Sequence, residues 1–263
     1  MSTYSGIIGD LRTIGEDTFS VTVPENWMQG RTTYGGLTAA IGLEAATRVV
    51  TDMPIRCAQV SFIGPVGGEV SLLVNVLRRG KSSAFVNVDV LNDLGVMARS
   101  VFTFGASRAS SIDHSGLPMP SARRPDEIEP FFSSDRPGPT FAKNFEVLQA
   151  AGARPLTGAS EGDIHLWLRH RDDGAPVTAA TLLSIADAPP PAAMPMMSVP
   201  APISSMTWMA EFLSEDVATT DGWYFCRHVA DTAHDGYSSQ SMMLWNASGK
   251  PLMIGRQTVA IFS

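Results

Sequence analysis

The segment that decides the fold spans residues 33–50 and has the sequence TYGGLTAAIGLEAATRVV. It is rich in alanine and leucine, and Glu44 stands four residues before Arg48, a spacing at which opposite charges stabilise a helix. Its many glycines and alanines leave a surface that another backbone can approach closely. We therefore predict a helix over residues 33–50 that lies against a sheet.

The residues after this helix predict an antiparallel sheet. Four apolar stretches have the length and composition of strands: 55–63, 69–78, 84–92 and 96–104. In the third stretch, Val86, Val88 and Val90 alternate with polar residues, as expected of a strand with one buried face. The turn sequence at 92–95 indicates a hairpin, and hairpins join antiparallel strands.

A second helix-and-sheet unit follows a proline-rich segment. Residues 113–138 contain five prolines and no hydrophobic periodicity, which is typical of a linker. The elements expected after it are strands near 140–148, 163–170, 203–213, 222–231, 237–246 and 252–262, and a helix over 176–187. We predict an N-terminal domain at 1–112, a linker at 113–138 and a C-terminal domain at 139–263.

The two units contain matching landmarks. Pro54-Ile55 begins a strand in the first unit, and Pro202-Ile203 begins one in the second, about half a chain later. A repeated unit of this size indicates duplication of a single fold. A helix packed on an antiparallel sheet, present twice, predicts the α+β class.

Composition excludes several classes of function. Hydrophobic residues make up 44% of the 263 residues and charged residues 17%, which is typical of a folded protein. The net charge of −7 disfavours nucleic acids and anionic membranes as partners. The first residues lack a basic region and an apolar stretch, and no apolar run reaches membrane-spanning length. We therefore expect a cytoplasmic protein.

No metal or other cofactor is expected. Cys57 and Cys226 stand far apart in apolar segments, which predicts free, buried thiols. His228 and Asp231 would face opposite sides of a strand and His234 lies toward a turn, so these residues do not make a ligand set. Phosphate-binding, dinucleotide-binding and serine-hydrolase motifs are absent from the sequence.

Three stretches, taken together, are similar to one family. The first is RTTYGG at 31–36, where the predicted helix begins; the second is the strand 55–65, which ends SFIGP. The third is the turn at 246–249, followed eight residues later by Gln257. Their order and spacing resemble the type II acyl-CoA thioesterases. The resemblance implies a double hotdog fold, in which two tandem antiparallel sheets each wrap around a long helix.

The resemblance also implies a catalytic site with neither a covalent nucleophile nor a metal. By position in the family's motifs, Asp187, Ser205 and Gln257 hold the attacking water. A carboxylate in a partly desolvated pocket can accept a proton from water, and hydroxyl and amide groups can orient that water. The expected activity is hydrolysis of an acyl-CoA to the free acid and CoA, without a cofactor and by a homo-oligomer.

Substrate contacts are assigned to five further residues. Tyr34, Gly35 and Gly36 stand at the helix start, where unpaired backbone N–H groups can bind a thioester carbonyl or a CoA phosphate. Gln59 and Thr207 occupy positions at which members of the family carry a histidine and an acidic residue. The glycine pair also suits close packing of the helix on a sheet, with no role in binding.

Other interpretations of these residues remain open. Asp187 precedes three prolines and fits a simple turn residue, while Ser205 and Gln257 fit strand residues that face solvent. One alternative function is a non-catalytic acyl- or CoA-binding protein. Another is a hotdog acyl-CoA hydratase, although neither predicted helix contains the histidine that this chemistry uses.

Overall fold

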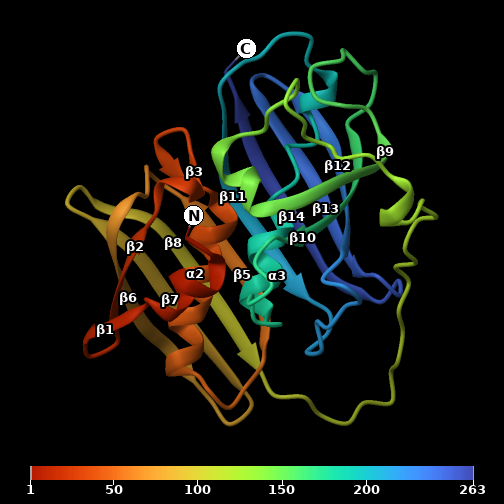
Figure 1. The fold of residues 1–263 in the computed structure, drawn as a ribbon. Coiled ribbons are helices and arrows are strands. Elements are labelled where there is room, and N and C mark those ends of the chain that lie inside the picture. Colours follow the sequence, from red (N-terminus) through yellow and green to blue (C-terminus); the bar gives the residue numbers. More distant parts are fainter. Residues whose placement is uncertain (1, 263) are drawn as a thin grey trace.

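One antiparallel sheet of twelve strands runs through residues 2–262, the part of the chain that the computed structural model describes (Figure 1). Its strands are β1 (Arg12–Gly15), β2 (Thr18–Val23), β5 (Ile55–Phe62), β6 (Gly68–Arg79), β7 (Ser83–Asn92), β8 (Gly95–Gly105), β9 (Phe145–Gly152), β10 (Asp163–His170), β11 (Ile203–Phe212), β12 (Tyr224–His234), β13 (Tyr237–Asn246) and β14 (Pro251–Ile261). The remaining elements are the helices α1 (Tyr4–Gly9), α2 (Gly35–Val49) and α3 (Ala179–Ala186), the hairpin of β3 (Met28–Gln29) and β4 (Thr32–Thr33), and the 3-10 turns η1 (Glu25–Trp27), η2 (Pro125–Glu127), η3 (Thr140–Asn144) and η4 (Met194–Met196).

The two predicted units are the two halves of this one sheet. Across it the strands follow the order β1-β2-β6-β7-β8-β5-β11-β14-β13-β12-β10-β9, so the N-terminal half precedes the C-terminal half without a gap. The halves join where β5 pairs antiparallel with β11, from Ser61 opposite Thr207 to Cys57 opposite Glu211. These are the two strands that begin at the repeated Pro-Ile pairs. The two tandem sheets of the prediction are thus joined edge to edge, and this pairing leaves neither β5 nor β11 with an open edge.

The α+β hotdog arrangement is confirmed, although its second helix is short. Helix α2 extends over 15 residues, close to the predicted range. Helix α3 has eight residues because Thr178 caps it, accepting a hydrogen bond from the backbone N–H of Thr181 at 3.3 Å. The predicted start of this helix at residue 176 is therefore too early, because Pro176 lies before Ala179, the first residue of α3.

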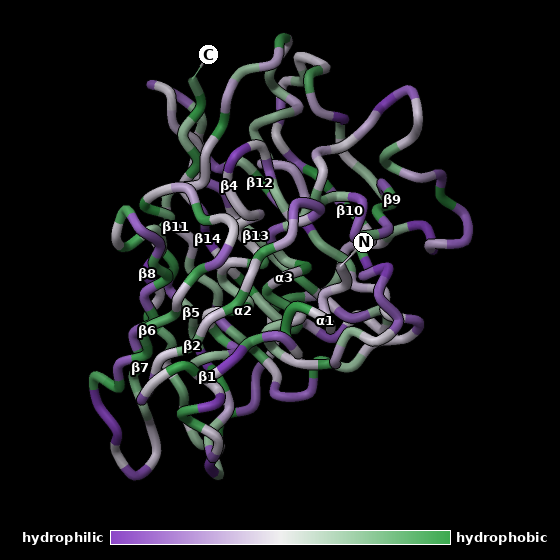
Figure 2. The backbone as a smooth tube through the Cα atoms, turned by 60° about the vertical axis from the view of Figure 1, so that its left-hand side comes forward, coloured by the Kyte–Doolittle hydropathy of each residue, from purple (hydrophilic) through white to green (hydrophobic). Residues whose placement is uncertain are grey.

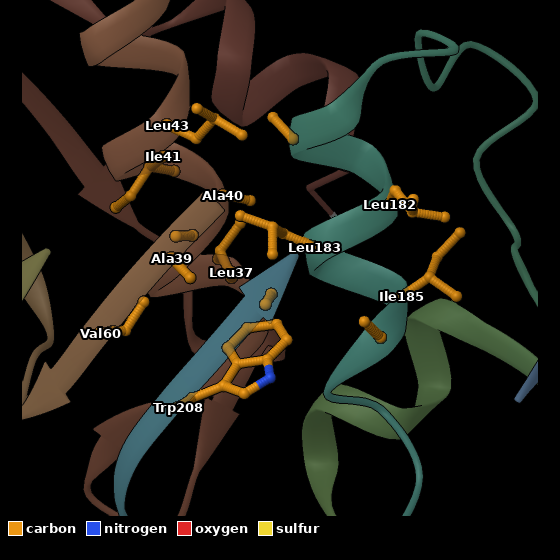
Figure 3. Close-up of a cluster of buried hydrophobic side chains, with 14 of the residues drawn as sticks. Leu37, Ala39, Ala40, Ile41, Leu43, Val60, Leu182, Leu183, Ile185 and Trp208 are labelled. Atoms are coloured by element: carbon orange, nitrogen blue, oxygen red, sulfur yellow. The ribbon is translucent and has the colours of Figure 1, made fainter. Parts of the chain in front are cut away.

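The two helices pack against each other above the inner face of the sheet. Leu37 and Ile41 of α2 and Leu183 of α3 are fully buried, together with Val60 of β5 and Trp208 of β11 (Figure 3). Burying each such leucine or isoleucine contributes about 1.5–3 kcal/mol. In Figure 2 the hydrophobic segments gather around α2 and α3, while the most hydrophilic ones lie in loops at the rim. One continuous core therefore spans both halves.

The proline-rich segment covers part of the outer face of the C-terminal half. It crosses from β8 to the far edge of the molecule (Figure 1). Two tryptophans of the sheet hold it by donating to its backbone, Trp167 to the carbonyl of Arg123 and Trp245 to that of Leu117, each at 2.9 Å. Met119, Ala122 and Ile128 pack there against a second apolar cluster, so this linker is also a structural cover.

Candidate active site

A cavity of about 280 Å³ lies between the two halves, at the start of α2. Both halves contribute to its wall. The lining residues are Gln29, Arg31, Thr32, Thr33, Gly35, Thr38, Phe62, Ile63, Gly64, Pro65, Val66, Asp187, Pro191, Ile203, Ser204, Ser205 and Val259. Two of the three predicted catalytic residues, Asp187 and Ser205, are among them.

Asp187 is placed by the ends of both helices. It is the C-cap of α3 and lies against the N-terminus of α2. A Cβ added to Gly35 would lie only 2.7 Å from Asp187 Oδ2, so glycine is required for this approach. The other carboxylate oxygen, Oδ1, accepts a hydrogen bond from Nε2 of Gln257 at 2.8 Å. Two residues that are 70 positions apart in the sequence therefore form one polar pair.

The surroundings of Asp187 prepare it to accept a proton. Burial raises the pKa of its carboxyl to about 7, while the Gln257 amide and the backbone N–H of Gly36 lower it. The N-terminus of a helix also favours a negative charge. A carboxyl whose pKa lies near neutrality is partly ionised at that pH and can both take up and release a proton.

A β-bulge decides which residues of β11 face the cavity. Ser205 pairs with Val259 and lines the cavity, but the register shifts between Ser205 and Thr207. Residues two apart on a regular strand face the same side. Because the bulge inserts Met206, Ser205 turns inward and Thr207 is exposed. The hydroxyl of Ser205 is therefore available to a ligand in the cavity.

Gln257 is held by a residue that the sequence analysis missed. Its side chain is only 3% exposed, and its Oε1 accepts a hydrogen bond from Nε2 of Gln240 at 2.7 Å. Gln240 lies opposite Gln257 in the pairing of β13 with β14 and is itself 1% exposed. A signal for it was present in the sequence, since Gln240 occupies an inward position of an alternating strand, as Gln257 does.

Tyr34 and Gly36 contact other residues of the protein and do not line the cavity. Tyr34 is buried, and its ring stacks on Phe141 of the C-terminal half at 4.1 Å between centroids. Its hydroxyl donates to the Ser184 carbonyl at 2.7 Å, in the last turn of α3, where helix carbonyls lack intrahelical partners. The backbone N–H of Gly36 acts on Asp187. Of the three residues at the start of α2, only Gly35 lines the cavity.

We expect Tyr34→Phe to lower stability and leave substrate binding unchanged. The variant keeps the stacked ring but removes the donor to the buried Ser184 carbonyl, which should cost about 1–3 kcal/mol in the free energy of unfolding. Urea denaturation and KM measured on the same preparation would check this. A raised KM with unchanged stability would instead indicate that Tyr34 contacts the substrate.

Gln59 and Thr207 lie outside the cavity. Gln59 is exposed on β5 between the buried residues Ala58 and Val60, so it faces the outer side of the sheet. Its partner across the strands is Met209, two residues beyond Thr207 on the same outer face. The geometry therefore separates both residues from Asp187 and gives no support to the predicted substrate contacts.

The cysteines and histidines do not assemble into a metal centre within residues 2–262, where no three metal-ligating side chains gather. Cys226 is buried as predicted, whereas Cys57 is only half-buried, and both thiols are free. His228 is buried under α3, while His234 lies exposed at the end of β12. None of the helices in the same range is long and apolar enough to cross a membrane.

Comparisons with known proteins show the family and the fold of this chain. Family models match at residues 23–105, described as an acyl-CoA thioesterase N-terminal domain, and at 120–261, described as an acyl-CoA thioesterase C-terminal domain. No protein of curated function matches the sequence.

Solved structures show the same fold over the whole chain. A conserved protein of unknown function with a hot dog fold from Alicyclobacillus acidocaldarius superposes with a TM-score of 0.89 at 20% identity, covering 100% of this chain and 99% of the other. A putative thioesterase from Novosphingobium aromaticivorans gives 0.80 at 24% identity, with 97% and 99% covered. The acyl-CoA thioesterase II TesB2 from Mycobacterium marinum gives 0.78 at 18% identity, with 98% and 97% covered. Because the models of the acyl-CoA thioesterase family match both halves of this chain, the chain belongs to that family.

Proposed function

We propose that this protein hydrolyses acyl-CoA thioesters in the cavity between its two halves. The observation that carries the proposal is the pair of Asp187 and Gln257, joined at 2.8 Å, with Asp187 on the cavity wall. Ser205 lies on the same wall and supplies a hydroxyl. Family membership, shown by the matches to both halves, points to the same substrate class.

The reaction begins with a water molecule in the cavity beside Asp187. Asp187 Oδ1 is occupied by Gln257, so Oδ2 is the oxygen that takes the proton as the water attacks the thioester carbonyl carbon. The carbonyl oxygen becomes negative in the tetrahedral intermediate. When this intermediate collapses, the C–S bond breaks, and the proton passes from Asp187 to the departing sulfur. The products are the free acid and CoA.

Ser205 and Gln257 supply donors for the charge that develops. The amide nitrogen of Gln257 carries two hydrogens, and one of them is used by Asp187. We assign the second hydrogen and the Ser205 hydroxyl, which lies on the cavity wall, to the water or the oxyanion. Donors fixed in advance at such a position are worth far more in a low-dielectric site than in bulk water. Neither group has to become a nucleophile.

The direct test is to incubate the protein with acyl-CoAs of different chain lengths and detect free thiol. Release of CoA with one equivalent of free acid supports the proposal. A change in enoyl absorbance without thiol release would identify a hydratase. Saturable binding without turnover would identify a binding protein, and either result would overturn the proposal.

The role of Ser205 can be tested with two substitutions. We expect Ser205→Thr to keep close to the wild-type kcat, because the hydroxyl persists. Ser205→Ala removes the donor and should lower kcat about 10²–10³-fold, as loss of an oxyanion donor does. Steady-state kinetics on both variants would measure the difference. If Ser205→Ala retained full kcat, the serine would only line the cavity.

A further inference from the structure

Three buried polar groups form a single chain of hydrogen bonds that ends on Asp187. The backbone N–H of Ala192 donates to Oε1 of Gln240 at 2.7 Å. Nε2 of Gln240 donates to Oε1 of Gln257 at 2.7 Å, and Nε2 of Gln257 donates to Oδ1 of Asp187 at 2.8 Å. Ala192 follows Pro191 of the cavity wall and is fully buried.

The first member of this chain fixes the direction of all the others. A backbone N–H can only donate, so the amide oxygen of Gln240 must face Ala192. The amide nitrogen of Gln240 then faces Gln257, whose oxygen has to accept from it. The nitrogen of Gln257 is thereby left facing Asp187. Size alone gives an amide no preferred end, because its oxygen and nitrogen are almost equal in size.

The anchor at Ala192 is itself held rigidly. A Cβ added to Gly162, just before β10, would lie 2.2 Å from the Ala192 carbonyl oxygen, so the two backbones are in close contact. The carbonyl of Gly162 accepts from the N–H of Ala230 on β12 at 2.7 Å. The segment that carries Ala192 therefore rests on the sheet, and its N–H has a fixed direction.

We propose that Gln240 is a positioning residue of the active site, which makes Gln257 present its N–H and not its carbonyl to Asp187. The inference rests on the proposed function, because it assigns Asp187 the role of general base. Gln240 does not touch the cavity. It acts through Gln257, and its own 1% exposure means that it has no other partner in solvent.

The direction of the Gln257 amide matters because Asp187 is buried. An N–H facing the carboxylate stabilises the ionised form, whereas a carbonyl oxygen facing it would require the carboxyl to be protonated. A protonated carboxyl cannot take a proton from water. The hydrogen bonds that run from Ala192 through Gln240 and Gln257 thus favour the ionised form of Asp187, whereas burial by itself favours the neutral form.

The test compares Gln240→Met with wild type on an acyl-CoA substrate. Methionine has a similar length but cannot donate a hydrogen bond, so Gln257 loses its constraint. We expect kcat to fall about 10- to 100-fold with little change in KM, and the acidic limb of the kcat–pH profile to move to higher pH. Gln240→Glu should recover part of the rate at acidic pH, since a protonated carboxyl can accept from Ala192 and donate to Gln257.

Ser238→Ala is the matched control. Ser238 lies on the same strand and the same inner face as Gln240, is 1% exposed, and its hydroxyl makes no hydrogen bond within residues 2–262. The control should keep the wild-type rate and pH profile. Thermal unfolding of all variants shows whether each one is folded at the assay temperature.

A measurement without substrate separates this inference from the proposed function. Carbon-13 NMR titration of the Asp187 carboxyl, assigned with Asp187→Asn, gives its pKa whether or not the protein hydrolyses acyl-CoA. If the pKa of Asp187 is higher in Gln240→Met than in wild type and Ser238→Ala, the positioning role of Gln240 is supported even if no thioester is cleaved. An unchanged pKa, or a folded Gln240→Met with the wild-type pH profile, would overturn it, and so would a lowered kcat with no shift in the acidic limb.

Discussion

Asp187→Asn is expected to lower kcat about 10²–10⁴-fold while the protein keeps its fold, because loss of a general base typically has this cost. Asparagine is nearly isosteric with aspartate, and its side-chain oxygen can still accept the hydrogen bond that Gln257 donates at 2.8 Å. It cannot take up the proton of the attacking water. KM should change little, since the change removes a step and not a binding contact. Acyl-CoA hydrolysis and thermal unfolding on one preparation measure both effects.

The double variant with Gln257→Ala gives an internal control. Gln257→Ala alone should lower kcat about 10²-fold or more, because the amide both donates to Asp187 and offers a second N–H to the reacting atoms. The two changes combined should cost far less than the product of the separate effects, since both residues act on the same water. If Asp187→Asn kept near-normal activity at an unchanged melting temperature, Asp187 would be only the cap of α3.

Acidification from pH 6.5 to 4 should destabilise the protein through two buried histidines. Burial lowers the pKa of His170 to about 4 and that of His228 to about 3, against 6.5 for an exposed histidine. His170 is enclosed by the rings of Tyr4 and Phe145, with centroids 4.9 and 4.7 Å away. In this pH range the unfolded chain binds a proton at each histidine and the folded chain does not. Each therefore lowers the free energy of unfolding by about 1.4 kcal/mol per pH unit.

Asp187 has the opposite effect over the same range. Its pKa is raised from 3.8 to about 7, so the folded chain binds its proton first and gains stability as the pH falls. In this range the unfolded state binds two protons, at the histidines, and the folded state binds one, at Asp187. The free energy of unfolding therefore falls by about 1.4 kcal/mol per pH unit, or roughly 3.5 kcal/mol over the range. His165, whose pKa burial also lowers, adds to the loss, while Glu44, whose pKa burial raises, offsets part of it.

Denaturant titrations at several pH values would measure this slope. Asp187→Asn removes the opposing group, so its slope should be about twice that of the wild type in the same range. His228→Phe keeps a buried ring but removes one titrating group, and its slope should be shallower. A wild-type stability that stays constant or rises between pH 6.5 and 4 would contradict the assignment of the histidines as buried neutral groups.

Most elements of the fold could be predicted from the sequence because their signals are local. The small residues and the charge spacing of 33–50 predicted α2 within two residues at each end. Alternation in 84–92 predicted β7, and the strands from β5 to β8 fall within one residue of their predicted limits. By contrast, β1 and β2 were missed. The strand β1 is exposed throughout and therefore shows no alternation of buried and exposed residues.

The residues of the site could be chosen from the sequence, but their grouping could not. Motif resemblance selected Asp187, Ser205 and Gln257. Their meeting depends on β11 pairing with β14 and on α3 ending beside α2, contacts between segments that lie far apart in the chain. The local sequence does not specify which of these distant segments come into contact.

Three features of the site depend on the tertiary structure alone. The bulge after Ser205 turns Thr207 away from the cavity, although the period of a regular strand would place both on one face. Enclosure by both halves gives Asp187 a pKa of about 7, a property of its surroundings and not of its residue type. The direction of the Gln257 amide comes from Gln240 and Ala192, 17 and 65 positions away. Periodicity and motifs determine which residues face inward, whereas dielectric surroundings and hydrogen-bond direction exist only once the two halves have closed around the cavity.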